Sequence, residues 1–122
     1  MMKVFSTHFV LKGKSDYKDL APVFRNILKA LLEEIGQMPE EEEIFQMFVD
    51  MNMVDIERNR KPEGYNRKGR MRLIFPMDRK EFYLKTYSKS TDMSRMTEII
   101  SSLLTSAGVK FEILHNDRTD FE

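Results

Sequence analysis

The sequence predicts a single α+β domain in which helices pack against an antiparallel sheet. Apolar and polar residues alternate, as they do in half-buried strands, in four segments: 3–12, 71–75, 81–87 and 109–114. Apolar residues recur at three- and four-residue spacing, as they do in amphipathic helices, in two longer segments: 20–35 and 93–107. With 122 residues the chain suits one hydrophobic core and not two.

The first strand and the first helix are bounded by residues that favour turns and caps. Gly13 ends the strand, and either Ser15 or Asp16 can cap the helix that follows. Pro22 is expected in the first turn of that helix, where a missing amide hydrogen costs little. These residues set the expected end of the first strand and the expected start of the first helix.

The segment from residue 39 to residue 58 allows three interpretations. A proline followed by four glutamates predicts the first turn of a second helix, because acidic side chains there meet the positive end of the helix dipole. The apolar residues that follow are too many for a narrow buried stripe. Either the helix is buried on most sides, or the chain becomes a strand near Asn52, which the alternation in 53–58 favours, or a partner subunit covers the extra face. The residues expected to contact such a partner are Phe45, Phe48 and Met51.

The second half of the chain predicts a hairpin, a helix and a last strand. Turn-forming residues at 76–79 join the two strands of the hairpin. Ser90 or Thr91 is expected to cap the last helix, and Gly108 is expected to end it.

The resulting order is strand, helix, inserted element, hairpin, helix and strand. This order is typical of a ferredoxin-like split β-α-β sandwich, with an antiparallel sheet that has its helices on one face. The inserted element is a short helix, with or without a strand, after the first long helix. Residues 1–114 are expected to form the domain, and residues 115–122 a polar C-terminal tail.

Positive charge is concentrated between residues 57 and 72, although the chain as a whole is formally neutral. Seven of these residues are Lys or Arg and two are Glu. Five of the seven are arginines, whose guanidinium groups bind phosphate at two points and stack on bases. Protection of a strand edge, or solubility, explains the same pattern equally well. The candidate nucleic-acid-binding residues of the segment are Arg58, Arg60, Lys61, Arg67, Lys68, Arg70 and Arg72.

A second group of candidate residues lies on the sheet. If Phe9 and Phe82 point toward the helices, their neighbours along each strand point to the opposite face. Two tyrosines and several cations on an open face would form a stacking platform for single-stranded nucleic acid. The alternative is a solvated face with ordinary cross-strand pairs. The residues expected on this face are Ser6, His8, Arg70, Arg72, Tyr83, Lys85 and Tyr87, of which Tyr83, Lys85 and Tyr87 join the candidate nucleic-acid site.

The composition excludes several kinds of site. The chain has no cysteine, which rules out disulfides, thiolate nucleophiles and Cys-based metal centres. It has two histidines, and neither belongs to a metal-binding or catalytic motif. We therefore expect no enzyme activity, no metal and no cofactor. Without a leader peptide or a long apolar segment, we expect a cytoplasmic protein with no membrane partner.

Two functions are consistent with these patterns. The first is a small non-enzymatic module that binds single-stranded or structured nucleic acid, preferably RNA, through the basic segment and the open sheet face. The neutral net charge weighs against it, because affinity for nucleic acid comes largely from released counterions. The alternative is a protein-interaction or regulatory accessory module, with self-association through residues 44–56 as one form. An open, basic and aromatic sheet would favour the first, and a buried sheet or a covered Met-rich helix the second.

Overall fold

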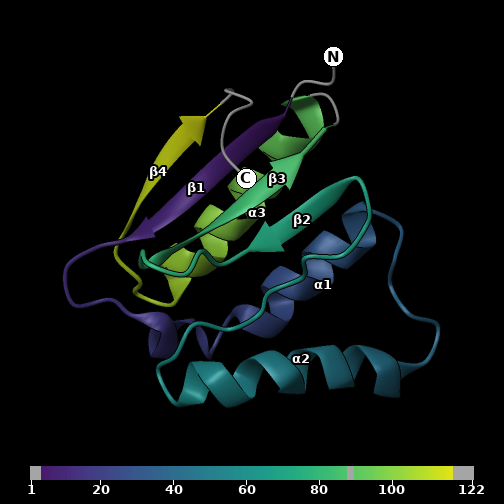
Figure 1. Cartoon of the computed structure of the whole chain (residues 1–122), viewed down its shortest axis with the longest axis horizontal. Helices are drawn as coiled ribbons and strands as arrows, with labels where there is room; N and C mark the ends of the chain where they lie inside the picture. Colours follow the sequence, from purple (N-terminus) through teal and green to yellow (C-terminus); the bar gives the residue numbers. More distant parts are fainter. Residues whose placement is uncertain (1–3, 88–89, 117–122) are drawn as a thin grey trace.

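Four antiparallel strands form one sheet in the order β2-β3-β1-β4 (Figure 1). The structure is a computed structural model that describes residues 4–87 and 90–116. Strands β1 and β3 lie in the middle of the sheet, and β2 and β4 form its edges. The strands are β1 (Phe5–Leu11), β2 (Met71–Ile74), β3 (Glu81–Thr86) and β4 (Phe111–Asn116).

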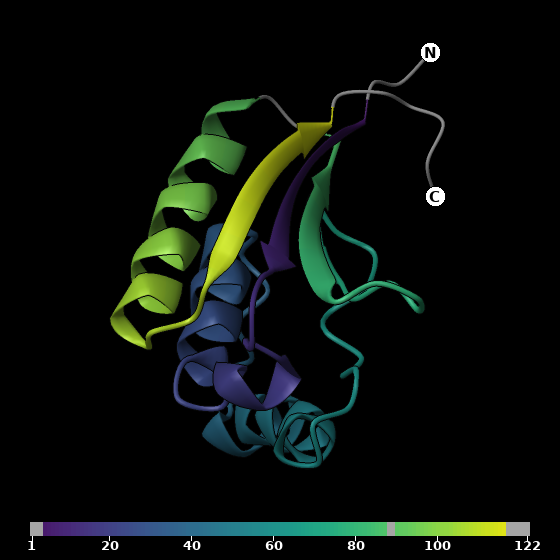
Figure 2. The same ribbon diagram turned by 90° about the vertical axis from the view of Figure 1, so that its left-hand side faces the viewer.

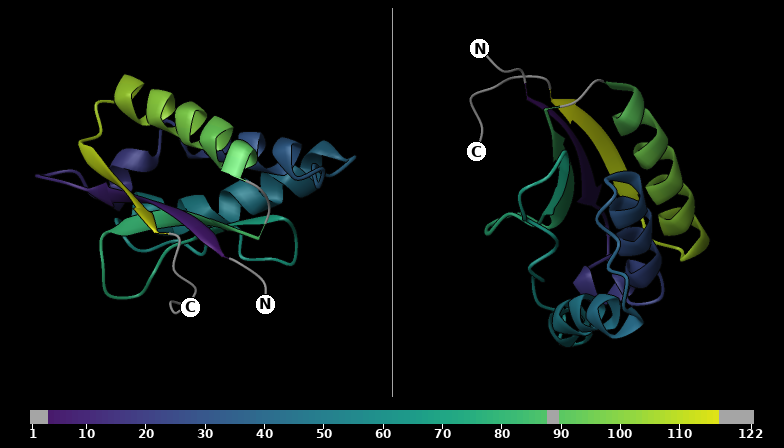
Figure 3. Two further views of the ribbon diagram at one scale, coloured as in Figure 1. Left: turned by 90° about the horizontal axis from the view of Figure 1, so that it is seen from above. Right: turned by 90° about the vertical axis from the view of Figure 1, so that its right-hand side faces the viewer.

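Two helices, α1 (Phe24–Glu34) and α3 (Ser90–Ser106), cover one face of this sheet (Figures 2 and 3). Each helix turns an apolar stripe toward the strands, and Leu28, Leu31 and Met96 in these stripes are completely buried. The predicted α+β class is confirmed. In the described part of the chain, no helix combines the length and the apolar character needed to cross a membrane.

The strand register decides which side chains reach the core. Phe9 of β1 pairs with Phe82 of β3, and their stacked rings have centroids 5.1 Å apart. Leu73 of β2 pairs with Leu84 of β3 in the same layer, and all four side chains are buried. The prediction that Phe9 and Phe82 face the helices is confirmed. Their neighbours along each strand therefore lie on the opposite side of the sheet.

A 3-10 helix, η1 (Tyr17–Leu20), precedes α1 and divides the helix predicted for residues 20–35. Asp16, and not Ser15, is the cap: its carboxylate accepts a hydrogen bond from the amide of the next residue. The carboxylate of Asp19 accepts from the amide of Asp16 at 2.8 Å, which completes a capping box. Pro22 lies in the turn between η1 and α1 instead of in the first turn of a longer helix.

The inserted element is one continuous helix, α2 (Glu42–Glu57). The predicted change into a strand near Asn52 is wrong. Asn52 donates a hydrogen bond to the carbonyl of Phe48, one turn earlier, and is 3 % exposed. The apolar alternation that suggested a strand arises because α2 has apolar residues on two sides. The helix ends at Glu57, and Asn59 just beyond it has a φ of +56°, a left-handed conformation that asparagine tolerates.

The end of the domain differs slightly from the prediction. Gly108 terminates α3 with a φ of +75°, as predicted. Strand β4 continues to Asn116, so the first two residues of the predicted tail belong to the sheet. His115 pairs with Thr7 of β1, with 3.2 Å between its Nδ1 and the threonine Oγ1. Two predicted features lie outside the described part of the chain: the side-chain caps at Ser90 and Thr91, and the tail at 117–122.

Leu28→Ala should lower the free energy of unfolding by about 2 to 5 kcal/mol, because it opens a cavity in the middle of the α1 stripe. Chemical denaturation measures the change. Leu114→Ala is the control, since Leu114 is 48 % exposed on β4 and its truncation should cost less than about 1 kcal/mol. Equal, small effects of both substitutions would show that the core lies elsewhere.

Candidate functional site

The basic segment, residues 57–72, runs from the end of α2 to the beginning of β2 (Figure 1). Tyr65 forms an isolated antiparallel bridge with Leu73, in which each amide donates to the carbonyl of the other at 2.9 Å. The segment therefore covers part of the outer edge of β2, which would otherwise present unpaired backbone groups.

Asn52 of α2 holds the middle of the basic segment. Its Oδ1 accepts a hydrogen bond from the amide of Gly64 at 2.6 Å, and its Nδ2 lies 3.3 Å from the carbonyl oxygen of Gly64. Gly64 has a φ of +76°, and a Cβ at this position would lie 2.5 Å from the carbonyl oxygen of Leu73. Only glycine fits without distortion where the segment passes between α2 and β2.

Gln37, in the connection between α1 and α2, holds the following part of the segment. Its Oε1 accepts from the hydroxyl of Tyr65 at 2.8 Å, and its Nε2 donates to the carbonyl of Lys68 at 3.0 Å. Neither Gln37 nor Asn52 is predicted from the sequence. Asn52 could have been identified from the sequence, because it is a polar residue at the spacing of the buried apolar stripe of α2. No sequence pattern identifies Gln37.

Two arginines of the basic segment contact different kinds of group: Arg60 contacts a carboxylate, and Arg67 contacts aromatic rings. Nη2 of Arg60 lies 3.1 Å from Oδ1 of Asp55, so this charge is balanced by a carboxylate. The guanidinium of Arg67 lies over two rings, 4.9 Å from the centroid of Phe48 and 5.8 Å from that of Tyr65. Arg67 thus keeps its charge at the surface, on an aromatic support.

Other cations of the segment are not paired with acids. Nζ of Lys61 donates to a backbone carbonyl at 3.4 Å, and Nη1 of Arg72 donates to an asparagine amide oxygen at 3.3 Å. Arg58 and Lys68 are exposed and form no ion pair with any described residue. Within the described residues, the segment's cations that lack a carboxylate partner are Arg58, Lys61, Arg67, Lys68 and Arg72.

Arg70 lies with the helices, and its predicted place on the opposite face of the sheet is wrong. Its Nη1 is 3.2 Å from Oδ2 of Asp92 in α3, and its Nη2 donates to the carbonyl of Glu34 at the end of α1. Arg95 forms a two-point pair with the carboxylate of Glu34, at 3.0 and 2.6 Å. The hydrogen bonds from Arg95 lower the pKa of Glu34 below its ordinary value. These contacts tie α1 to α3 and occupy Arg70.

The sheet face away from the helices does carry the predicted aromatic and cationic side chains, but it is not open. His8 and Tyr83 are cross-strand partners whose stacked rings have centroids 4.5 Å apart. They are 8 % and 4 % exposed, and Ser6 and Lys85 are equally buried. Tyr87 is 41 % exposed. The predicted exposure is therefore wrong for Tyr83 and Lys85.

Three buried polar side chains on this face form a hydrogen-bonded row. Nε2 of His8 lies 3.0 Å from the hydroxyl of Ser6, and Nδ1 of His8 lies 2.6 Å from Oε2 of Glu81. This order is that of a Ser-His-acid triad. However, Ser6 is 4 % exposed, and β1 pairs with a strand on each side, so its amides are not available as oxyanion donors. The row is better explained as a network that satisfies buried polar groups.

In the described part of the chain, no three histidine or acidic side chains lie close enough together to hold a metal ion.

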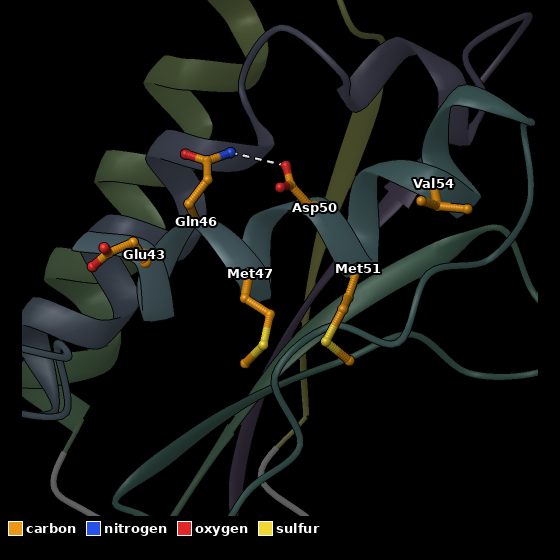
Figure 4. A pocket seen from close by; sticks show the side chains of 6 residues that line it. All are labelled: Glu43, Gln46, Met47, Asp50, Met51 and Val54. Carbon is orange, nitrogen blue, oxygen red and sulfur yellow. Dashed lines mark hydrogen bonds between the residues drawn. The ribbon is translucent and has the colours of Figure 1, made fainter. Parts of the chain in front are cut away.

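The side of α2 away from the core carries a row of exposed apolar side chains. Ile44, Met47, Met51 and Val54 are 38, 47, 48 and 49 % exposed, and we call these four residues the outer stripe. Figure 4 shows Met47 and Met51 projecting in the same direction from the helix. A shallow hollow along this row is lined by Glu43, Gln46, Met47, Asp50, Met51 and Val54.

One of the three residues predicted to contact a partner belongs to the outer stripe, namely Met51. Phe45 is 3 % exposed beneath the guanidinium of Arg25, so it lies in the core and not at the surface. Phe48 is half-buried against Tyr65, with 5.8 Å between the ring centroids. The regular spacing of the other stripe residues was a sequence signal that could have identified them.

Comparison of the chain with models of protein families, with curated proteins and with solved structures finds no match.

Asn52→Ala should release the basic segment from α2. The amides of Gly64 and Tyr65 should exchange hydrogen faster, and the free energy of unfolding should fall by about 1 to 3 kcal/mol, because the backbone groups of Gly64 lose a buried partner. Hydrogen exchange and chemical denaturation measure the two effects. Asn26→Ala, at an exposed position of α1, is the matched control. Unchanged exchange at Gly64 would mean that other contacts hold the segment.

Proposed function

We propose that this protein is a non-enzymatic interaction module whose docking surface is the outer stripe of α2. The observation that carries the proposal is a row of four large apolar side chains, each between 38 and 49 % exposed, along one side of one helix. Single exposed apolar residues are ordinary on soluble proteins. A contiguous row bordered by polar residues is typical of an interaction surface.

Burial of the outer stripe would supply part of the binding energy. Complete burial of a Val, Ile or Met side chain is worth about 1.5 to 3 kcal/mol. Because the four side chains are roughly half exposed, their joint burial contributes on the order of 3 to 6 kcal/mol before the costs of association. Contacts of the charged residues beside the stripe must add to this for a specific complex.

The second candidate function is binding of single-stranded or structured nucleic acid, preferably RNA, by the basic segment. In its favour, five cations of the segment have no carboxylate partner within the described residues. Asn52 and Gln37 hold the backbone that carries them, so the cations are presented from a fixed position. The burial of Tyr83 and Lys85 weakens this proposal and leaves Tyr87 as its exposed aromatic contact.

We also propose the ferredoxin-like assignment for the fold. Its support is the order β1-α1-β2-β3-α3-β4 that remains when η1 and α2 are set aside, together with the position of β3 between β1 and β2. On this assignment α2 is an insertion between α1 and β2. The docking helix is then an addition to the framework and not part of it.

A photo-crosslinking residue at position 47 tests the docking surface. The protein with benzoylphenylalanine in place of Met47 is produced in the cells of its source and irradiated. We expect one discrete adduct, identified by mass spectrometry, because Met47 lies in the middle of the outer stripe. The matched control carries the same residue in place of Lys29, which is exposed on α1. The absence of an adduct at position 47, or the same adducts at both positions, would contradict the proposal.

Changing Arg58, Arg67 and Lys68 together to Gln tests the second function. Binding to a single-stranded RNA should weaken about tenfold or more, and its salt dependence should flatten by about 0.7 logarithmic units per lost phosphate contact. Fluorescence anisotropy over a salt series measures both. The control changes the exposed Lys14, Lys29 and Lys110 to Gln and loses the same charge. If the wild-type protein does not bind the RNA at about 50 mM salt, the nucleic-acid function is excluded.

A further inference from the structure

We infer that the outer stripe of α2 is occupied by the same stripe of a second copy of this chain, with the two helices parallel. The inference rests on the proposed docking function and names its partner. Ile44, Met47, Met51 and Val54 are separated by three, four and three residues. This is the spacing of the a and d positions of a two-stranded coiled coil, with Ile44 and Met51 at a. One helix can therefore pack along another through this stripe.

The opposite side of α2 is already anchored in its own domain. Phe45, Val49, Asn52 and Ile56 recur at intervals of four, three and four residues and are at most 3 % exposed. The buried and exposed rows do not share a residue. A second copy can therefore dock on α2 without moving the helix out of its own core.

One flank of the outer stripe is acidic. Glu43, Asp50 and Glu57 are spaced by seven residues, so they occupy the same heptad position, g, beside the stripe. All three are exposed. α2 contains five acidic residues and no lysine or arginine, so nothing on the helix itself balances this flank.

The other flank is covered by cations of the basic segment. Its heptad position, e, is filled by Phe48 and Asp55. Arg67 lies over the ring of Phe48 at 4.9 Å, and Arg60 is 3.1 Å from the carboxylate of Asp55. Because Asp55 balances the charge of Arg60, the net positive charge on this side of the stripe comes from Arg67. The fold, and not the helix sequence, places it there.

Parallel pairing brings the unlike flanks together. In a parallel pair, position g of one helix faces position e of the other, five residues further along, whereas in an antiparallel pair g faces g. Glu43 would then meet Arg67 of the second copy, and Asp50 would face the Asp55–Arg60 ion pair of the second copy. The twofold axis repeats both contacts. Antiparallel pairing would instead place acidic flank against acidic flank.

The ends of the helix oppose this arrangement, but more weakly. Parallel pairing places Glu42 in the first turn, and Arg58 at the other end, near the same residues of the second copy. These groups are exposed at the helix ends, where water and salt screen repulsion between them. The flank contacts lie beside the buried stripe and are screened less.

Other occupants match the surface less well. A basic helix of another protein would complement the acidic flank and be repelled by Arg67. A membrane surface with anionic lipids attracts helices whose polar face is rich in lysine and arginine, and α2 has neither. A second copy of this chain supplies both charges in the required positions.

The purified wild-type protein should form a reversible dimer in sedimentation equilibrium, with a dissociation constant on the order of micromolar because the interface is small. Met51→Glu should raise this constant about tenfold or more, since it places a carboxylate in the apolar seam. Leu114→Glu is the matched control: Leu114 is also 48 % exposed, lies on β4, and the charge change is the same. A wild-type monomer up to about 1 mM, or equal effects of the two substitutions, overturns the inference.

Single cysteines test the orientation, since the chain has no cysteine of its own. In a parallel pair each residue of the stripe lies beside its own copy, so Ile44→Cys and Val54→Cys should each give disulfide-linked dimers when oxidised separately. In an antiparallel pair neither would do so, but a mixture of the two variants would. Linking only in the mixture overturns the parallel arrangement.

The result at position 47 separates this inference from the proposed function. A self-adduct of the benzoylphenylalanine variant supports both. An adduct with a different protein, together with a monomeric purified chain, upholds the docking surface and overturns the second copy as its partner. The absence of any adduct overturns both.

Discussion

The contact between Asn52 and Gly64 determines what this protein presents at its surface. Asn52 lies in an otherwise apolar buried row of α2. Its side chain forms hydrogen bonds with both the backbone N–H and the backbone carbonyl of Gly64. These bonds draw the basic segment against α2, and Gly64 lets it pass close to the carbonyl of Leu73. A buried amide that is fully hydrogen-bonded specifies one position for its partner, because any shift leaves polar groups unpaired.

Once the basic segment lies against α2, the two sides of the outer stripe become different. Arg67 rests on Phe48 and brings a positive charge to one side of a helix that has no cation of its own. On the same side, Arg60 balances the carboxylate of Asp55. The acidic residues of the helix border the other side. Two features that are separate in sequence, an apolar helix and a basic segment, thus form one surface.

Burial of the sheet face changes the interpretation of the polar residues that it carries. His8, Tyr83 and Lys85 share the face that their strand positions predict. They are nevertheless buried, and His8 bonds Ser6 and Glu81 while it stacks on Tyr83. Such a network contributes to a unique arrangement of the strands, since each buried polar group requires its partner. Under the proposed function, this buried face contributes little to recognition and the docking surface is the outer stripe of α2.

The sequence by itself determined the class of the fold and most of its elements, because these depend on local periodicity and turn residues. The stripe around Leu28, the alternation around Phe9 and the helix end at Gly108 are all visible in the chain. Only the tertiary structure decided that α2 stays helical through Asn52, that Arg70 joins the helix ends and that Tyr83 is buried. Each of these outcomes depends on hydrogen bonds with, or burial by, groups that are distant in sequence, and a local sequence pattern does not predict such contacts.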